Sequence, residues 1–171
     1  FHTEDVDGLY HYMKNDKAPS SLPATIKRSA DMKAFNWRDI NMMTPVKNQK
    51  SCGSCWAFSA IGVYEGVYKI MNGKDIDLSE QYLLSCLSKA GSCSGGNSWN
   101  ALRLIRSNQS DGNYCNGVIP EICFPYQAID TVPCSEKCAN WQDYLVPLSD
   151  YGMIDPTQRE LVKSVGLLRP R

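Results

Sequence analysis

The sequence is poor in histidine, in net charge and in long hydrophobic runs. His2 and His11 are its only histidines, and we interpret both as solvated side chains rather than metal ligands. Lysine and arginine together number 18, as do aspartate and glutamate, so the basic surface that nucleic-acid binding requires is not expected. Glu65 interrupts the most hydrophobic segment, which leaves no apolar run of the ~20 residues that cross a bilayer. We therefore expect neither a nucleic-acid partner nor a membrane.

Cysteine, in contrast, is abundant. Eight cysteines in 171 residues are unusual in a reducing cytosol and predict disulfide bonds in an oxidising setting, either secreted or in a lysosomal or vacuolar-like compartment. The chain begins at Phe1 rather than methionine and shows no signal peptide. We interpret it as a processed product or as part of a longer reading frame.

The chain has no internal repeat and divides into a polar start and a helical body. Residues 1–34 are polar and lack a periodic hydrophobic pattern, so we interpret them as an extension or linker. Residues 54–71 are apolar on nearly every helical face, which is typical of a buried central helix. Asn72 and Gly73 are expected to end this helix, because glycine suits the left-handed C-terminal cap.

A second helix is expected to begin after Ser79, whose side chain can cap the free backbone N–H groups. Leu78 precedes the cap and can pack against Leu83. The hydrophobic pattern continues toward Cys86. The glycine-rich stretch 91–96 that follows is expected to be a loop.

Two more helices are expected, on either side of a loop-rich region at residues 107–153. The first begins near Ser98 or Trp99. Its inward apolar side chains would be Ala101, Leu102 and Ile105. The second follows the loop-rich region: Asp155 is its cap, Pro156 takes the first helical position and Gly166 lies just past its end.

Cys52 and Cys55 form a Cys-x-x-Cys pair, which is compatible with three chemistries. A redox pair of the thioredoxin type follows a buried strand, but residues 44–50 are polar and contain Pro45. A zinc site needs a second ligand pair. Cys134 and Cys138 could supply one, yet they lie far along the chain and no histidine accompanies them. Redox and metal chemistry are therefore both disfavoured.

The third chemistry makes Cys55 a nucleophile at the start of the central helix. The helix dipole and the free N–H groups at that end favour the thiolate, which is the reactive form. Gln49 lies six residues earlier. Its side-chain amide and the backbone N–H of Cys55 could together form an oxyanion hole for acyl transfer. Cys52 is then available for a structural disulfide bond.

The sequence around this pair resembles the active-site stretch of the papain-like cysteine peptidases, the papain and cathepsin family. Residues 52–56, Cys-Gly-Ser-Cys-Trp, fit the family signature. The other stretches that resemble the family are residues 35–38, 44–49, 78–81, 93–96 and 124–126. Asn36 stands where the family normally has aspartate. The similarity covers residues 35–166.

The resemblance implies an α+β, papain-like fold, of which this chain holds mainly the helical, nucleophile-bearing lobe. Residues 1–34 would be an N-terminal extension or the end of a prosegment. Residues 35–171 would be the helical lobe, which stops before the β-barrel lobe. The implied activity is that of a cysteine-type endopeptidase, a thiol protease that hydrolyses peptide or protein substrates through a thioester and uses no cofactor or metal.

Carried over residue by residue, the resemblance makes Cys55 the nucleophile and Gln49 the oxyanion donor. The substrate-binding residues that it implies are Gly53, Gly95, Gly96, Asn97 and Ser98. The glycines would let the backbone approach an extended substrate, because no Cβ intervenes. Asn97 and Ser98 fall where the family usually has an apolar specificity pocket. A polar wall and a weaker preference for large apolar side chains are therefore expected.

The resemblance also implies which distant side chains meet. The pairs are the disulfides Cys52–Cys93 and Cys86–Cys134, and the ion pair of Lys47 with Glu80. Three cysteines stay unassigned: Cys115, Cys123 and Cys138. With Cys55 free, seven cysteines remain, which is an odd number. One of them would be a free thiol or would pair outside this chain.

The general base of the family is a histidine about 130–150 residues after the cysteine, oriented by an asparagine. Both positions fall outside this sequence, and His2 and His11 precede Cys55. We therefore expect the chain to be inactive alone and its partner to be the C-terminal lobe of the same protein. The alternative is a non-catalytic, peptidase-like binding module that holds peptides without cleaving them. A histidine and an asparagine downstream of residue 171 would favour the enzyme.

Overall fold

The computed structural model describes residues 36–107 and 116–148, which belong to two compact units. The first unit includes residues 36–44 and 65–75; the second includes 45–64, 76–107 and 116–148. The extension expected at 1–34 and the helix expected after Asp155 lie outside the described residues. Within the described parts of the chain, no helix is both long and apolar enough to cross a membrane.

The longest described helix is α3 (Cys55–Asn72), close to the predicted range 54–71. The carbonyl of Ser54 accepts hydrogen bonds from the N–H groups of Ala57 and Phe58, which closes the first turn. Gly73 ends the helix at a φ of +65°, the left-handed cap that glycine adopts without strain. The start and the end of this helix were therefore predicted correctly.

One face of α3 is not buried, which corrects the expectation of a helix covered on every side. Ser59 and Val67 are exposed and Val63 is half-buried. These residues recur every four positions, so they lie along one stripe of the helix. An apolar sequence pattern could not show this, because valine is apolar wherever it points.

The first unit has a small core of its own. Trp37 in the short 3-10 helix η2 (Trp37–Ile40) is buried together with Ile70 of α3. The partly buried side chains packed against them are Ile40, Met42 and Met43.

Two buried charged groups on the same part of α3 also have hydrogen-bond partners in this unit. Glu65 accepts a bond of 2.8 Å from the hydroxyl of Thr44. Lys69 donates to the carbonyl of Met43 at 3.0 Å and pairs with Asp75 at 2.7 Å. These bonds offset the cost of removing the two charges from water.

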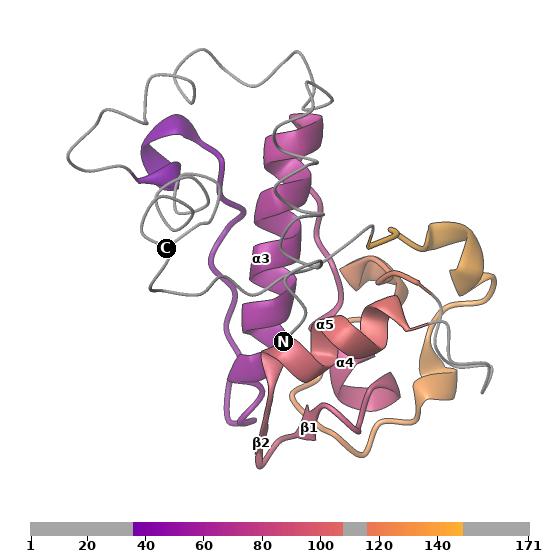
Figure 1. The fold of residues 1–171 in the computed structure, drawn as a ribbon. Helices are drawn as coiled ribbons and strands as arrows, with labels where there is room; N and C mark the ends of the chain where they lie inside the picture. The colour runs from indigo at the N-terminus through magenta and orange to yellow at the C-terminus, as the bar shows by residue number, and fades with distance from the viewer. Residues whose placement is uncertain (1–35, 108–115, 149–171) are drawn as a thin grey trace, which may run out of the picture. The chain divides into compact units, whose positions relative to one another are not determined.

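In the second unit, α4 (Glu80–Cys86) begins as the sequence predicts (Figure 1). The Ser79 hydroxyl accepts a 2.9 Å bond from the N–H of Tyr82, as an N-cap does. The same hydroxyl donates to the carbonyl of Phe124 at 2.6 Å. Leu78 and Leu83 are both completely buried. The cap therefore also joins α4 to a segment far along the chain.

The stretch expected to be a loop at 91–96 is instead a hairpin. Strands β1 (Gly91–Ser92) and β2 (Gly95–Gly96) pair antiparallel, and Gly91 lies opposite Gly96. The chain then enters α5 (Ser98–Arg106), which begins where the sequence predicts (Figure 1). Leu102 was expected to point inward but is only half-buried. The buried side chains of α5 are Ala101, Leu104 and Ile105.

Residues 116–148 are loop-rich, as expected, and contain only short 3-10 helices. Their bounds are η3 (Glu121–Cys123), η4 (Cys134–Glu136) and η5 (Trp141–Tyr144). Isolated β-bridges join Leu78 to Pro120 and Val118 to Val146. Since these helices are too short to be stable alone, the segment depends on such cross-connections and on disulfide bonds.

Candidate active site

Cys55 is the first residue of α3, and its thiol is both free and exposed. The N–H groups of the first helical turn have no intrahelical partners, and the helix dipole places partial positive charge at this end. Both effects favour the thiolate form of a cysteine. The position is therefore suited to a nucleophile that a substrate can reach.

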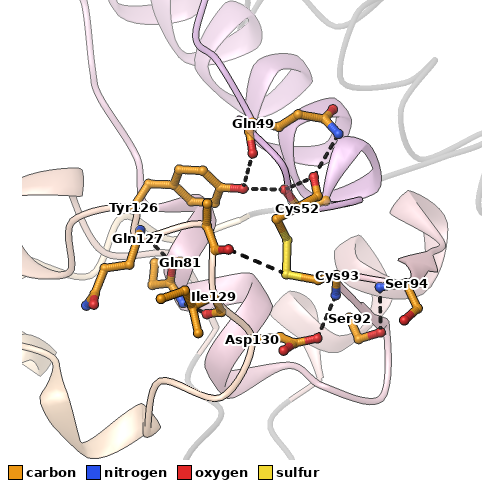
Figure 2. The surroundings of a disulfide bond; sticks show 12 residues. Gln49, Cys52, Gln81, Ser92, Cys93, Ser94, Tyr126, Gln127, Ile129 and Asp130 are labelled. Atoms are coloured by element: carbon orange, nitrogen blue, oxygen red, sulfur yellow. Dashed lines mark hydrogen bonds between the residues drawn. A yellow bond between two sulfur atoms is a disulfide. The ribbon is translucent and has the colours of Figure 1, made fainter.

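Gln49 is half-buried on the turn that precedes the helix. Its side-chain amide donates to the carbonyl of Cys52 at 2.8 Å, and Figure 2 shows the side chain folded back over that residue. An amide NH₂ group carries two hydrogens, and this bond uses one of them. The second hydrogen can donate to a substrate oxygen, which is the role expected for Gln49.

Residues 47–54, which precede Cys55, are called the nucleophile loop after the role expected for Cys55. The disulfide of Cys52 with Cys93 joins this loop to the hairpin, and the two Cα atoms are 4.6 Å apart. This is the pair that the family resemblance implies. Gly53 lies against the same turn: its N–H donates to the carbonyl of Cys93 at 2.8 Å. A Cβ on Gly53 would stand 2.5 Å from that carbonyl oxygen. Glycine is therefore required here by the disulfide-linked turn itself.

The hairpin glycines have a structural reason that the sequence did not reveal. A Cβ on Gly96 would lie 2.7 Å from the ring of Trp56 and 2.7 Å from the Cα of Gly91. The same indole donates to the carbonyl of Ser92 at 3.1 Å. Gly95 has a φ of +120°, which side chains rarely allow. The space that a Cβ of Gly96 would need is thus filled by other atoms of the protein. This packing requires glycine at position 96 whether or not the residue also contacts a substrate.

Asn97 and Ser98, expected in a specificity pocket, lie at the start of α5. Asn97 is exposed, and its side-chain oxygen accepts a 3.0 Å bond from the N–H of Asn100. It is the N-cap of α5, a function that its place directly before a helix could have suggested. Ser98 is half-buried as the first helical residue.

Figure 2 also shows residues of the segment 126–130 at this site. The sequence had not indicated their contacts. The hydroxyl of Tyr126 lies between the carbonyl of Gln49 and the hydroxyl of Ser54, at 2.9 and 2.6 Å. Asp130 accepts a 2.8 Å bond from the N–H of Cys93. The segment 126–130 thus contacts both the nucleophile loop and the hairpin. In the sequence, the only indication that this segment belongs to the site was the similarity of residues 124–126 to the family pattern.

Two further disulfides hold the second unit. Cys86 is bonded to Cys134, the second pair that the resemblance implies, with Cα atoms 5.0 Å apart. Cys123 is bonded to Cys138, two cysteines that the sequence left unassigned. Cys115 lies outside the described residues.

The ion pair expected between Lys47 and Glu80 is confirmed, with 3.1 Å between nitrogen and oxygen. Lys47 also pairs with Asp77 at 2.6 Å and donates to the carbonyl of Leu78 at 2.9 Å. The lysine thus joins the lead-in of the nucleophile loop to the start of α4. In the described residues, no group of three or more histidine, cysteine, aspartate or glutamate side chains could hold a metal ion.

A free, exposed thiol at a helix start, preceded by a disulfide-linked loop that also carries an amide donor, is typical of enzymes that use a cysteine nucleophile. The family model of the papain family cysteine proteases matches residues 32–170. The chain therefore belongs to the papain family of cysteine proteases.

Individual relatives agree with this assignment. Chymopapain from Carica papaya is 37% identical over 131 residues, which cover 75% of this chain and 32% of chymopapain. Procathepsin L from Rattus norvegicus is 39% identical over 142 residues, covering 81% of this chain and 39% of that protein. The digestive procathepsin L2 proteinase of Tenebrio molitor larval midgut matches in structure with a TM-score of 0.62 and 36% identity, over 77% of this chain and 39% of that one.

The chain thus spans less than half the length of each of these relatives. The expected papain-like α+β fold, with helices and few strands in the described residues, is confirmed. The three disulfides fit an oxidising compartment.

Proposed function

We propose that the protein to which this chain belongs is a cysteine-type endopeptidase that hydrolyses peptide bonds through a thioester at Cys55. The observation that carries the proposal is the exposed, free thiol of Cys55 at the start of α3, on the same short loop as the amide of Gln49. Membership of the papain family supports it.

Cys55 and Gln49 account for the attack and for the stabilisation of the oxyanion. The thiolate of Cys55 attacks the carbonyl carbon of the scissile bond, and the carbonyl oxygen becomes an oxyanion. The amide of Gln49 and the N–H of Cys55 stabilise that oxyanion by hydrogen bonds. The C–N bond then breaks, the amine leaves with a proton from a general acid, and the thioester remains. Water hydrolyses the thioester and regenerates the thiol.

The proton on the leaving amine has to come from a general acid, for which papain-type sites use a histidine. The histidines of this sequence are His2 and His11, both before Cys55. We propose that residues 35–171 are the helical lobe, that the histidine and its orienting asparagine belong to a second lobe, and that these 171 residues alone do not turn over peptides. The substrates would be peptides or proteins, and the setting secreted or lysosomal.

The second candidate is a peptidase-like module that binds peptides without cleaving them. A coding sequence that continues past residue 171 with a histidine and an asparagine in the family's order would favour the enzyme. Continuation without them would favour the binding module.

Alkylation of the purified chain with iodoacetamide tests the proposed nucleophile. Peptide mapping by mass spectrometry should show S-alkylation at Cys55, and Cys55→Ala should remove that adduct. Cys115→Ser is the matched control and should leave labelling at Cys55 unchanged. Cleavage of a fluorogenic peptide should be undetectable. Failure to label Cys55 in the folded chain would contradict the role as nucleophile, and Cys55-dependent cleavage would contradict the proposed inactivity.

A further inference from the structure

The hydroxyl of Tyr126 lies within hydrogen-bond distance of two oxygens, the carbonyl of Gln49 and the hydroxyl of Ser54. A carbonyl oxygen can only accept, so the hydroxyl donates its one hydrogen to the carbonyl of Gln49, 2.9 Å away. The Ser54 hydroxyl lies 2.6 Å from the same phenol oxygen and donates to it while the phenol donates to Gln49; the other acceptor of Ser54, the carbonyl of Cys52, is farther away at 3.5 Å. Ser54 is completely buried. One phenol oxygen thus connects the residue before the nucleophile to the residue that carries the oxyanion amide.

The segment that carries Tyr126 is itself firmly held. The N–H of Tyr126 donates to the carboxylate of Glu121 at 2.7 Å. Gln81, completely buried in α4, accepts from the N–H of Gln127 at 2.9 Å and donates to the carbonyl of Ile129 at 2.8 Å. Figure 2 shows Gln81 beside Gln127 and Ile129, and the hydroxyl of Tyr126 pointing away from them toward Gln49. The tyrosine is therefore presented by a fixed support.

Two other short bonds hold the turn at Gln49, and both are local: the N–H of Lys50 donates to the side chain of Asn48 at 2.8 Å, and the Gln49 amide donates to the carbonyl of Cys52 at 2.8 Å. The carbonyl of Gln49 itself has weaker local support. The N–H of Cys52 reaches the carbonyl of Gln49 only at 3.4 Å, which is a long bond. The bond from Tyr126 to the same carbonyl is shorter by half an ångström. Because the Gln49 side chain grows from this backbone, any movement of the turn moves its amide. Oxyanion donors contribute most when they are held in place before the reaction.

We propose that Tyr126 is a positioning residue: its hydroxyl fixes the backbone of Gln49, and thereby the side-chain amide that donates to the oxyanion. This inference depends on the proposed function for the roles of Cys55 and Gln49. Burial raises the pKa of Tyr126 above its ordinary value of 10.0. The hydroxyl therefore keeps its proton, and its donor function, throughout the neutral range.

If Tyr126 had a purely structural role through its ring, loss of the hydroxyl alone would leave aldehyde binding unchanged. The ring of Tyr126 also packs edge-on against Phe58, with centroids 4.9 Å apart, and Tyr126→Phe keeps that ring. Tyr64 supplies the matched control, because its hydroxyl donates to the carbonyl of Val146 at 2.7 Å. Tyr64→Phe thus removes the same kind of bond without touching the turn at Gln49.

The test compares two reagents on the 171-residue chain. Iodoacetamide forms an S–C bond and releases iodide, so it needs no oxyanion donor. A peptide aldehyde adds the thiol of Cys55 across its carbonyl; the S–C bond forms, the thiol proton goes to the oxygen, and that oxygen sits where the oxyanion would.

Tyr126→Phe should weaken aldehyde binding by at least about fivefold, because misplacing an oxyanion donor costs part of the ~10²–10³-fold effect of deleting one. Its rate of alkylation by iodoacetamide should stay within about twofold of wild type, and Tyr64→Phe should leave both values within that range.

Aldehyde binding to Tyr126→Phe that matches wild type would overturn the inference, as would an aldehyde that shows no saturable binding to the wild-type chain. If circular dichroism shows that Tyr126→Phe does not fold, Ser54→Ala replaces it, because Ser54 holds the same phenol oxygen. In that variant, aldehyde binding weaker than in Tyr64→Phe is expected, together with faster hydrogen exchange at Cys52, whose N–H donates to the carbonyl of Gln49. Unchanged values there would refute the inference.

The outcomes for the proposed function are separate. Cys55→Ala should abolish both alkylation at this position and aldehyde binding, and Gln49→Ala should weaken only the aldehyde. Persistence of aldehyde binding in Cys55→Ala would refute the nucleophile assignment. A loss in Gln49→Ala without any loss in Tyr126→Phe would refute the positioning role alone.

Discussion

Glu80→Ala should be strongly destabilising, because the carboxylate is 2% exposed and lies 3.1 Å from the ammonium group of Lys47. Removal of one member of a buried ion pair typically costs ~3–5 kcal/mol. Lys47 is 24% exposed and also contacts Asp77 and the carbonyl of Leu78, so its charge keeps some compensation. We therefore expect the lower end, about 3 kcal/mol.

The chain offers a matched control on the same lysine. Asp77 pairs with Lys47 at 2.6 Å but is 66% exposed, and exposed pairs contribute only ~0–1 kcal/mol. Urea unfolding followed by circular dichroism should separate Glu80→Ala from Asp77→Ala by about 2 kcal/mol or more. Added salt should abolish the effect of Asp77→Ala and leave most of that of Glu80→Ala, because buried pairs are screened less. A loss below about 1 kcal/mol in Glu80→Ala, or equal losses in both variants, would refute the reasoning.

Three further outcomes concern the second unit. Replacing Cys123 and Cys138 by serine should lower the free energy of unfolding by about 3 kcal/mol in urea, since the disulfide closes a loop with a sequence separation of 15; an unchanged midpoint would contradict this. The raised pKa of Tyr126, caused chiefly by burial, means that the folded state resists ionisation of this phenol. Its contribution to stability should be constant up to about pH 10 and fall above it, as the unfolded tyrosine loses its proton first. Tyr126→Phe should show a smaller fall, and equal pH profiles would count against the shift. Gly96→Ala should destabilise the chain, because the new Cβ meets the indole ring and two backbone groups at 2.7 Å, whereas Gly62→Ala in α3 meets nothing within 4 Å and should stabilise by about 0.5–1 kcal/mol. A thermal melt in which the two glycine variants shift alike would show that the contact at Gly96 relaxes.

The sequence by itself determined where α3, α4 and α5 begin and where α3 ends. Ser79 caps a residue three positions away and Gly73 closes the helix that it follows, so both signals act within one helical turn. The place of Cys55 at the start of α3 follows equally from local order. Such features can be predicted because the interacting groups are close along the chain, so that formation of the helix itself brings them together.

The Cys52–Cys93 disulfide near Cys55 was expected from the family resemblance, but only the tertiary structure showed the hairpin, the Cys123–Cys138 bond and the contacts of Tyr126. The sequence left Cys123 and Cys138 without partners, and the hairpin at 91–96 showed no alternating pattern, because its strands are only two residues long. Tyr126 reaches Gln49 across 77 positions of sequence. Contacts of that kind depend on how α4, the hairpin and the loop 126–130 pack together. They close long loops of the chain, and the residues near each end of such a loop do not indicate which distant residue the end will meet.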